Sequence, residues 1–214
     1  MSMTAELSRL GASYRREGVE PSELESDPLA QFRRWHDEWL AAARPASSSA
    51  VLATADDAGR PSARWVDVAY VDHGFVFFTD HGSRKGADLA VNPRAALCFG
   101  WLEVGRQVRV EGEAARIPDV ESDAFFAALP RGIQSLAWAT DQRRIVNGGQ
   151  EVRESLAEVG ERFSGQEVPR PVHWGGYRLM PGEVEFWQRR ADEVQDRFRY
   201  SREGGGWRID QVAP

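Results

Sequence analysis

The sequence predicts an α+β protein organised around a small, mostly antiparallel β-barrel with a few peripheral helices. Three observations favour this class. Segments rich in β-branched and aromatic residues follow one another across short turns, helical periodicity is confined to a few stretches, and no internal repeat or low-complexity tract occurs. A chain of 214 residues, 42% hydrophobic and 28% charged, is also long enough to bury a substantial core.

The first half of the chain begins with a polar segment and continues as one helix and three strands. Residues 1–26 are polar and weakly periodic, so we expect a partly mobile N-terminal arm ahead of a single domain at 27–214. Large apolar residues recur at helical spacing over 27–44, where Asp27 suits the N-cap and Pro28 the first turn. Strands are expected at 50–56, 62–72 and 75–80, followed by a loop and a short helix within 81–93.

The second half of the chain is expected to complete the barrel. The alternation of Val184 and Phe186 with Glu183 and Glu185 indicates a strand, and this pattern stops after Phe186. The other elements are expected as strands at 95–104 and 106–117, a helix at 121–129, a second helix within 141–165, a strand at 168–187 and a glycine-turned hairpin at 198–214.

Composition argues against several classes of function. The net charge of −6 argues weakly against nucleic acid as the main partner. The N-terminal residues contain no apolar segment, so we expect neither a signal peptide nor a membrane anchor, and a cytoplasmic protein. The single cysteine, Cys98, lies in an apolar run, which favours a buried thiol and precludes a disulfide framework or a cysteine zinc site. No metal-ligand spacing is present, and His36 is expected on a helix face.

The loop Gly-Ser-Arg-Lys-Gly at 82–86 carries the first chemical signal. Ser83, Arg84 and Lys85 precede a short helix, whose N-terminal N–H groups and dipole favour an anion. Lys85 is the only lysine among 27 basic residues, which is suggestive because an ammonium and a guanidinium are not equivalent. Arg64 could reach the same end of the sheet. Taken alone, a basic loop is more often a solvated turn, and no GxGxxG, Walker or nucleophile-elbow motif is present.

The order of motifs along the chain resembles that of the pyridoxamine 5′-phosphate oxidase family. The matching segments extend from about Tyr14 to Pro214 and are DPLAQF, GRPSARWV, FFTDHGSRKG, NPRAAL, RQVRVEG, VPRPVHWGGYRL, EFWQ and DRFRY. The C-terminal EFW–DRF–Y pattern separates this family from other split-barrel flavoproteins. The resemblance implies a homodimer of FMN-binding split β-barrels, with two FMN molecules at the interface and a dimerisation segment at about 170–214.

The family's FMN contacts carry over, position by position, onto a coherent set of residues. These are Arg64, Trp65, Val66, Asp67, Phe78, Thr79, Ser83, Arg84, Lys85, Gln107, Gln142, Arg143, Trp187 and Arg197. The resemblance implies that Arg84 and Lys85 bind the phosphate and that Gln107 reaches across the interface; Arg143 stands where a serine is common. The set is chemically sensible, because cations suit a phosphate dianion and amides suit the polar edge of the flavin.

The family's substrate site, by contrast, is altered in this chain. Relatives grip the substrate phosphate with a lysine, a tyrosine, an arginine and a serine. The aligned residues here are Ala69, Phe125, Leu129 and Ile133. An arginine and a histidine that contact the substrate align with Glu193 and Gln195, while Tyr14 is retained and Gly11 replaces an N-terminal arginine. Each charged hydrogen bond contributes roughly 1.5–3 kcal/mol, so these losses argue against pyridoxine phosphate as the substrate.

These observations favour an FMN-dependent oxidase or desaturase for a non-phosphorylated aromatic or amine small molecule. The expected step is hydride transfer to flavin N5 with molecular oxygen as acceptor, Glu193 holding an amine or acting as a base, and Gln195 orienting the donor. Relatives in phenazine-type biosynthesis suggest secondary metabolism by analogy. Two alternatives stay open. One is pyridoxine/pyridoxamine 5′-phosphate oxidase itself, with Arg131, Arg189 or Arg190 as compensating cations, and the other is a non-catalytic flavin-binding protein.

Overall fold

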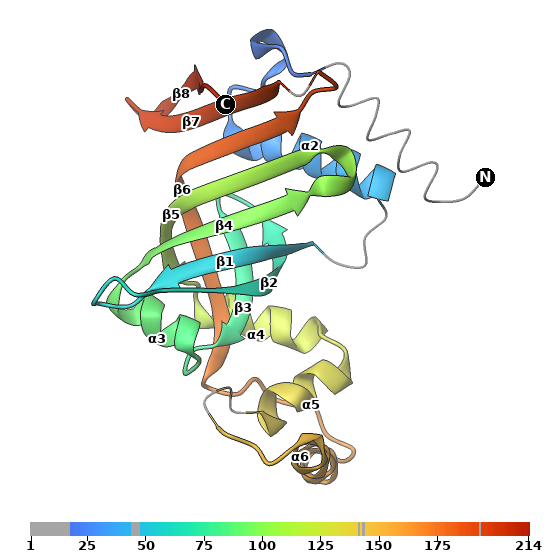
Figure 1. Ribbon diagram of the computed structural model, residues 1–214. Coiled ribbons are helices and arrows are strands. Elements are labelled where there is room, and N and C mark those ends of the chain that lie inside the picture. The colour runs from blue at the N-terminus through green and yellow to red at the C-terminus, as the bar shows by residue number, and fades with distance from the viewer. Residues whose placement is uncertain (1–17, 44–47, 141, 143, 193) are drawn as a thin grey trace, which may run out of the picture.

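The computed structural model of the chain describes residues 18–43, 48–140, 142, 144–192 and 194–214 (Figure 1). Over this part of the chain one antiparallel sheet has the strand order β3-β2-β1-β4-β5-β6-β7-β8, and an additional β3–β6 pairing closes the first six strands into a barrel. The strands are β1 (Ser49–Ala55), β2 (Pro61–Val71), β3 (Phe75–Asp80), β4 (Arg94–Trp101), β5 (Arg106–Arg116), β6 (Trp174–Arg189), β7 (Gln195–Glu203) and β8 (Gly206–Gln211). The α+β split barrel expected from the sequence is therefore confirmed.

The helices lie at the two ends of the barrel (Figure 1). They are α2 (Pro28–Ala43), α3 (Arg84–Val91), α4 (Asp119–Ala128), α5 (Arg131–Ala139) and α6 (Gly149–Arg162), with short 3-10 turns η1 (Pro21–Glu23) and η2 (Leu102–Val104). Helix α5 was not expected from the sequence. No helix among the described residues is long and apolar enough to cross a membrane.

The barrel core is aromatic and is closed at one end by α2. Phe32 of α2 packs edge-on against Phe75 and Phe99, and Trp35 packs against Phe186. The helix begins where the sequence predicts, because the Asp27 carboxylate accepts hydrogen bonds from the first free backbone N–H groups. The apolar spacing of α2 therefore reflects burial of one helix face against the barrel end.

Strand β6 is long because it belongs to two ladders. Its first part, Trp174–Leu179, pairs with β3, and its last part, Glu183–Arg189, pairs with β7. Between these parts the register with β5 shifts, and a side chain at Gly112 would lie 1.9 Å from the Met180 carbonyl oxygen. The strand thus continues past Phe186, where the sequence alternation stops.

Residues 18–26 are the described portion of the expected N-terminal arm, and they pack on the domain. Val19 is buried, and its backbone N–H donates to the Asp196 carboxylate at 3.0 Å. The end of this segment is held too, since the Tyr200 hydroxyl donates to the Glu25 carbonyl at 2.8 Å.

Candidate functional site

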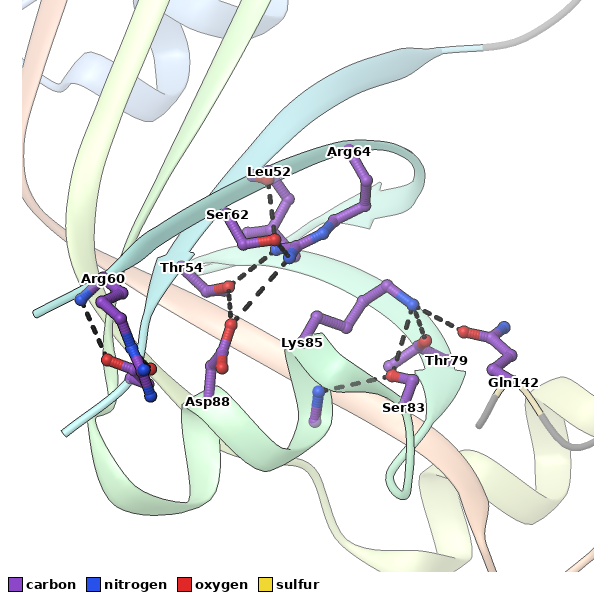
Figure 2. Close-up of polar contacts among 12 residues, drawn as sticks. Leu52, Thr54, Arg60, Ser62, Arg64, Thr79, Ser83, Lys85, Asp88 and Gln142 are labelled. Atoms are coloured by element: carbon purple, nitrogen blue, oxygen red, sulfur yellow. Dashed lines mark hydrogen bonds and ion pairs between the residues drawn. The ribbon is translucent and has the colours of Figure 1, made fainter. Parts of the chain in front are cut away.

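A cluster of polar side chains surrounds the N-terminus of α3, at one end of the barrel (Figure 2). Ser83 caps the helix, since its hydroxyl accepts the Gly86 N–H and donates to the Asp80 carbonyl. Gly86 has to be glycine, because a Cβ there would lie 2.2 Å from the His81 carbonyl oxygen. The loop after β3 is therefore folded tightly, and the first N–H groups of the helix face the cluster.

Lys85 has only neutral oxygen partners among the described residues. Its ammonium donates to Gln142 Oε1 at 2.8 Å, to Thr79 Oγ1 at 2.9 Å and to Ser83 Oγ at 3.3 Å (Figure 2). Burial lowers the pKa of Lys85 and the positive charge of Arg64 lowers it further, while the negative charge of Asp80 raises it in part. A half-buried ammonium without a carboxylate partner is well suited to bind an anion.

Arg64 extends from β2 toward the same cluster. Its guanidinium donates to Ser62 Oγ at 2.6 Å and Thr54 Oγ1 at 2.7 Å, and lies 3.9 Å from the Asp88 carboxylate (Figure 2). Burial lowers the pKa of Arg64, and the nearby charge of Arg84 lowers it as well. We define the phosphate cradle as Arg64, Arg84 and Lys85 with the α3 N-terminus. Three cations and free N–H groups match a phosphate monoester dianion.

A second group of expected cofactor residues lies in one row across three strands. Gln107 of β5 pairs with Trp187 of β6, which in turn pairs with Arg197 of β7. The Trp187 indole N–H donates to Gln195 Oε1 at 2.8 Å, and Arg197 donates to Glu185 Oε2 at 2.9 Å. The sheet therefore brings Gln195, expected on the substrate side, next to Trp187, expected at the cofactor.

The row and the cradle lie on opposite faces of the sheet. Directly paired residues share a face, and the pairs Trp65–Val51, Val51–Cys98 and Cys98–Arg109 connect Trp65 to the face of the row. Arg64, the next residue along β2, pairs with the fully buried Leu52 on the inner face. The Trp65 side chain is 68% exposed, so the outer face is open in a single protomer.

The remaining expected residues divide between the two faces and the helices. Val66 follows the inner face, whereas the Asp67 carboxylate on the outer face accepts the Ser49 hydroxyl at 2.5 Å. Ala69 is exposed on β2, Ile133 is 49% exposed on α5, and Leu129 packs beside the small cluster of Phe126, Phe163 and Val168. Tyr14, Arg143 and Glu193 lie outside the described residues.

An aromatic stack covers the outer side of β3. The Phe125 ring lies on the Phe78 ring, with centroids 3.9 Å apart and planes at 6°. The Trp174 ring stacks on the Phe78 ring with centroids 5.1 Å apart. The centroid of the Tyr70 ring lies within 6.4 Å of the centroids of both phenylalanine rings. The residue expected on the donor side, Phe125, thus contacts one expected at the cofactor, Phe78, through flat apolar surfaces.

Two of the three arginines that could compensate for the missing phosphate ligands are engaged elsewhere. Arg131 donates to the carbonyls of Phe163 and Gln166 at 2.6 and 2.8 Å. Arg190 pairs at 3.5 Å with Glu20 and with Asp196. Arg189 is exposed, 5.9 Å from the Trp187 ring centroid.

Sequence reasoning missed Thr54, Asp88 and Glu185. Each is a buried polar residue that contacts an arginine of the candidate site. Thr54 accepts a hydrogen bond from Arg64, Asp88 forms an ion pair with Arg64, and Glu185 accepts a hydrogen bond from Arg197. Their contacts join separate elements, so no local spacing announces them. The available signal was the presence of a polar residue at a position that the strand or helix pattern would bury.

Comparison with known proteins accounts for nearly the whole chain. Residues 36–163 match the family model described as pyridoxamine 5′-phosphate oxidase, and residues 174–214 match the model of the pyridoxine 5′-phosphate oxidase C-terminal dimerisation region. A pyridoxine/pyridoxamine 5′-phosphate oxidase of Rubrobacter xylanophilus is 46% identical over 98% of this chain and 97% of its own. A protein of the same name from Burkholderia thailandensis is 44% identical over 97% of this chain and 99% of its own.

Two solved structures share the fold. PhzG from Burkholderia lata, in complex with tetrahydrophenazine-1-carboxylic acid, superposes with a TM-score of 0.86 at 29% identity and covers 94% of this chain and 100% of its own. A pyridoxamine 5′-phosphate oxidase-related, FMN-binding protein from Nostoc punctiforme superposes with a TM-score of 0.70 at 17% identity, over 92% of this chain and 100% of its own.

Proposed function

The chain belongs to the pyridoxamine 5′-phosphate oxidase family, and from this premise we propose that it oxidises a non-phosphorylated aromatic or amine compound. The cofactor is FMN. When bound, FMN supplies a two-electron acceptor, which we propose molecular oxygen reoxidises. The observation that carries the substrate class is the apolar aromatic surface where relatives would grip a phosphate.

The residues of the cradle fit the cofactor's terminal phosphate. Arg64, Arg84 and Lys85 supply three positive charges, and no carboxylate of the described residues lies within ion-pair distance of Lys85, although the charge of Asp80 acts on it from farther away. In the proposed arrangement Thr79 and Gln142 keep the ammonium oriented before the ligand arrives. The chemistry of this donor set therefore suits FMN better than a flavin that lacks the phosphate.

We propose that each FMN is held by two protomers of the homodimer. The C-terminal dimerisation region supports the homodimer itself. Since Arg64 follows the inner face of the sheet, and Gln107, Trp187 and Arg197 lie on the outer face, we expect that one protomer does not present both groups to a single ligand. A partner whose outer face packs near the cradle would supply the missing row.

The proposed donor side selects a planar apolar molecule. Ala69, Phe125 and Leu129 carry no charge, and the two neighbouring arginines that could replace lost phosphate ligands, Arg131 and Arg190, already have partners. The PhzG neighbour is named with tetrahydrophenazine-1-carboxylic acid, which supports a polycyclic or partly reduced aromatic substrate and a role in secondary metabolism. In this reading Gln195, held by Trp187, orients the donor, and Glu193 holds an amine or takes a proton.

Anaerobic reduction of the bound flavin tests this proposal. The FMN-loaded protein is mixed with a panel of amines and dihydroaromatic compounds, and loss of the visible flavin absorbance reports turnover. We expect the reaction to be ~10³-fold or more faster than without protein. We expect bleaching by at least one non-phosphorylated dihydroaromatic donor, followed by recovery of colour when oxygen is admitted. Bleaching by pyridoxine phosphate alone would instead support a vitamin B6 oxidase, and bleaching by no donor would support a flavin-binding protein without turnover.

A vitamin B6 oxidase is the second candidate, because relatives at 46% and 44% identity are named pyridoxine/pyridoxamine 5′-phosphate oxidase. The one structural feature in its favour is Arg189, which is exposed beside the Trp187 ring. Arg189→Ala separates the two candidates. It should abolish oxidation of a phosphate ester if this arginine grips the phosphate, and leave oxidation of a neutral donor unchanged.

FMN affinity should depend on pH through Lys85. The pKa of this ammonium is lowered by burial and by Arg64, against a smaller opposing effect of Asp80, so it loses its proton below the ordinary lysine value of ~10.4. FMN should therefore bind tightly below the lowered pKa and progressively less tightly as pH rises through it. Fluorescence-quenching titrations measure the affinity, and Lys85→Arg, which keeps its charge, should flatten the profile. If FMN affinity falls equally steeply with pH in the wild type and in Lys85→Arg, Lys85 is not the group responsible.

A further inference from the structure

A buried carboxylate stands inside the phosphate cradle, where the ligand itself is an anion. Asp88 lies on α3 one turn after Arg84, and its side chain is 6% exposed. Its Oδ2 atom accepts the Thr54 hydroxyl at 2.6 Å and lies 3.9 Å from the Arg64 guanidinium (Figure 2). A buried negative charge so close to an anion site requires an explanation, because it opposes the ligand's charge.

The Thr54 hydroxyl connects Asp88 to Arg64. A hydroxyl has one hydrogen to donate, and Thr54 donates it in a hydrogen bond to the Asp88 carboxylate. The lone pairs of Thr54 Oγ1 are then free to accept the Arg64 N–H at 2.7 Å. Asp88 thus fixes the orientation of the hydroxyl, and the hydroxyl fixes the arginine head, which Ser62 holds from its other side.

The charges of the cradle repel one another when no phosphate is bound. The charge of Arg84 disfavours the charged form of Arg64, and Arg64 does the same to Lys85. Asp88 acts in the opposite sense on Arg64, and Asp80 does so on Lys85. Asp88 therefore offsets the part of the repulsion that falls on Arg64 in the flavin-free protein.

We propose that Asp88 is a positioning residue of the FMN site, which holds Arg64 in place through Thr54 and compensates the cradle's charge until the phosphate of FMN arrives. The proposal rests on the FMN site described above and is independent of the substrate. It has two consequences. The charge of Asp88 lowers the affinity for the phosphate, whereas the hydrogen-bonded chain from Asp88 to Arg64 raises it by keeping the arginine oriented.

The two roles can be separated with substitutions at Asp88 and Thr54. Asp88→Asn keeps an oxygen that accepts the Thr54 hydroxyl but removes the charge, whereas Thr54→Val removes the bridge but keeps the charge. Titration with FMN and with riboflavin isolates the phosphate contribution, because the two flavins differ only in that group. We expect Asp88→Asn to raise the preference for FMN over riboflavin by about tenfold, and Thr54→Val to lower it by about tenfold.

Three further measurements complete the test. Thr54→Ser, which retains the hydroxyl, should restore the preference that Thr54→Val loses. Glu154→Gln, which removes one negative charge from the exposed side of α6, should leave the preference unchanged. The flavin-free Asp88→Asn protein should melt at a lower temperature than the flavin-free wild type, and FMN should stabilise it more than it stabilises the wild type, because the phosphate replaces the lost negative charge.

The outcomes distinguish failure of this proposal from failure of the site itself. A wild type that binds riboflavin as tightly as FMN would overturn the phosphate cradle and, with it, the role of Asp88. A wild type that prefers FMN, together with an Asp88→Asn protein whose preference is unchanged or reduced, would overturn the charge role alone. Equal loss of preference in Thr54→Val and Thr54→Ser would overturn the positioning role. None of these readings depends on which donor the enzyme oxidises.

Discussion

The Arg84→Ala/Lys85→Ala protein is expected to be purified colourless and to bind added FMN about 10²- to 10⁴-fold more weakly than the wild type. Charge-assisted hydrogen bonds contribute roughly 1.5–3 kcal/mol each, so losing two of them costs about 3–6 kcal/mol of binding free energy. Riboflavin affinity should change little, because riboflavin lacks the phosphate. A matched control, Arg60→Ala/Arg153→Ala, removes two exposed arginines outside the cradle and should retain the yellow cofactor.

The same double variant tests whether two protomers share each flavin. It is mixed with a second variant protein, Trp187→Ala/Arg197→Ala, which leaves the cradle intact but removes two of the three residues of the row on the outer face. Neither variant alone should bind FMN well. In a mixed dimer, however, one of the two sites combines an intact cradle from one protomer with an intact row from the other. When equal amounts of the two variants reassort at random, half of the dimers are mixed, so mixing should recover about one FMN per four chains, whereas a site built within one protomer would show no recovery.

The local structure of this fold is largely readable from the sequence, while the closure of the barrel is not. Helix α2 follows from its cap at Asp27 and its apolar spacing, and the strands follow from their β-branched and aromatic residues. Closure depends on pairing Phe75–Asp80 with Trp174–Leu179, about a hundred residues later, which no local pattern specifies. The succession of antiparallel strands suggested a small barrel, but only the family resemblance implied a split barrel.

Two local features differ from what the sequence indicated, for identifiable physical reasons: β6 ends at Arg189 instead of residue 187, and helix α5 was not expected. The strand pattern stops after Phe186 in the sequence, yet β6 continues, because Gln188 faces inward and accepts a hydrogen bond from the buried Arg106 at 2.9 Å. The alternation of burial persists there although the alternation of hydrophobicity ends. Helix α5 was missed because it is short and follows Pro130, which starts the helix instead of merely ending α4.

Some residues of the candidate site could likewise be predicted from local sequence, and others could not. Ser83 and Lys85 could be singled out because a basic loop before a helix is a local signal with a known electrostatic meaning. Asp88 and Thr54 could not, since their contact joins α3 to β1 across 34 positions and their residue types are unremarkable in sequence. Packing decides which polar residues near an anion site face it, and packing is a property of the folded barrel.

Pyridoxine 5′-phosphate is expected neither to bleach the flavin of the wild-type protein nor to bind it in the micromolar range. The phosphate would give up its hydration beside Ala69, Phe125 and Leu129 without gaining a cation, at a cost of several kcal/mol. Pyridoxine, which lacks the phosphate, should bind at least as well as its ester. Oxidation of the ester at a rate ~10³-fold or more above that of pyridoxine would show that the substrate site is wrongly aligned.

Rebuilding the phosphate grip should reverse this preference. The combined variant Ala69→Lys, Leu129→Arg, Glu193→Arg and Gln195→His should bind the ester about 10²-fold more tightly than the wild type, and the single changes should contribute non-additively because they share one ligand. A matched set with Ala69→Gln, Leu129→Gln and Glu193→Gln supplies polarity without positive charge and should not do so. Leu129 packs beside the cluster of Phe126 and Phe163, so either polar residue there costs packing. Comparing the two sets therefore cancels that loss and leaves charge as the cause. If both sets bind the ester equally, the absence of cations does not explain the substrate class.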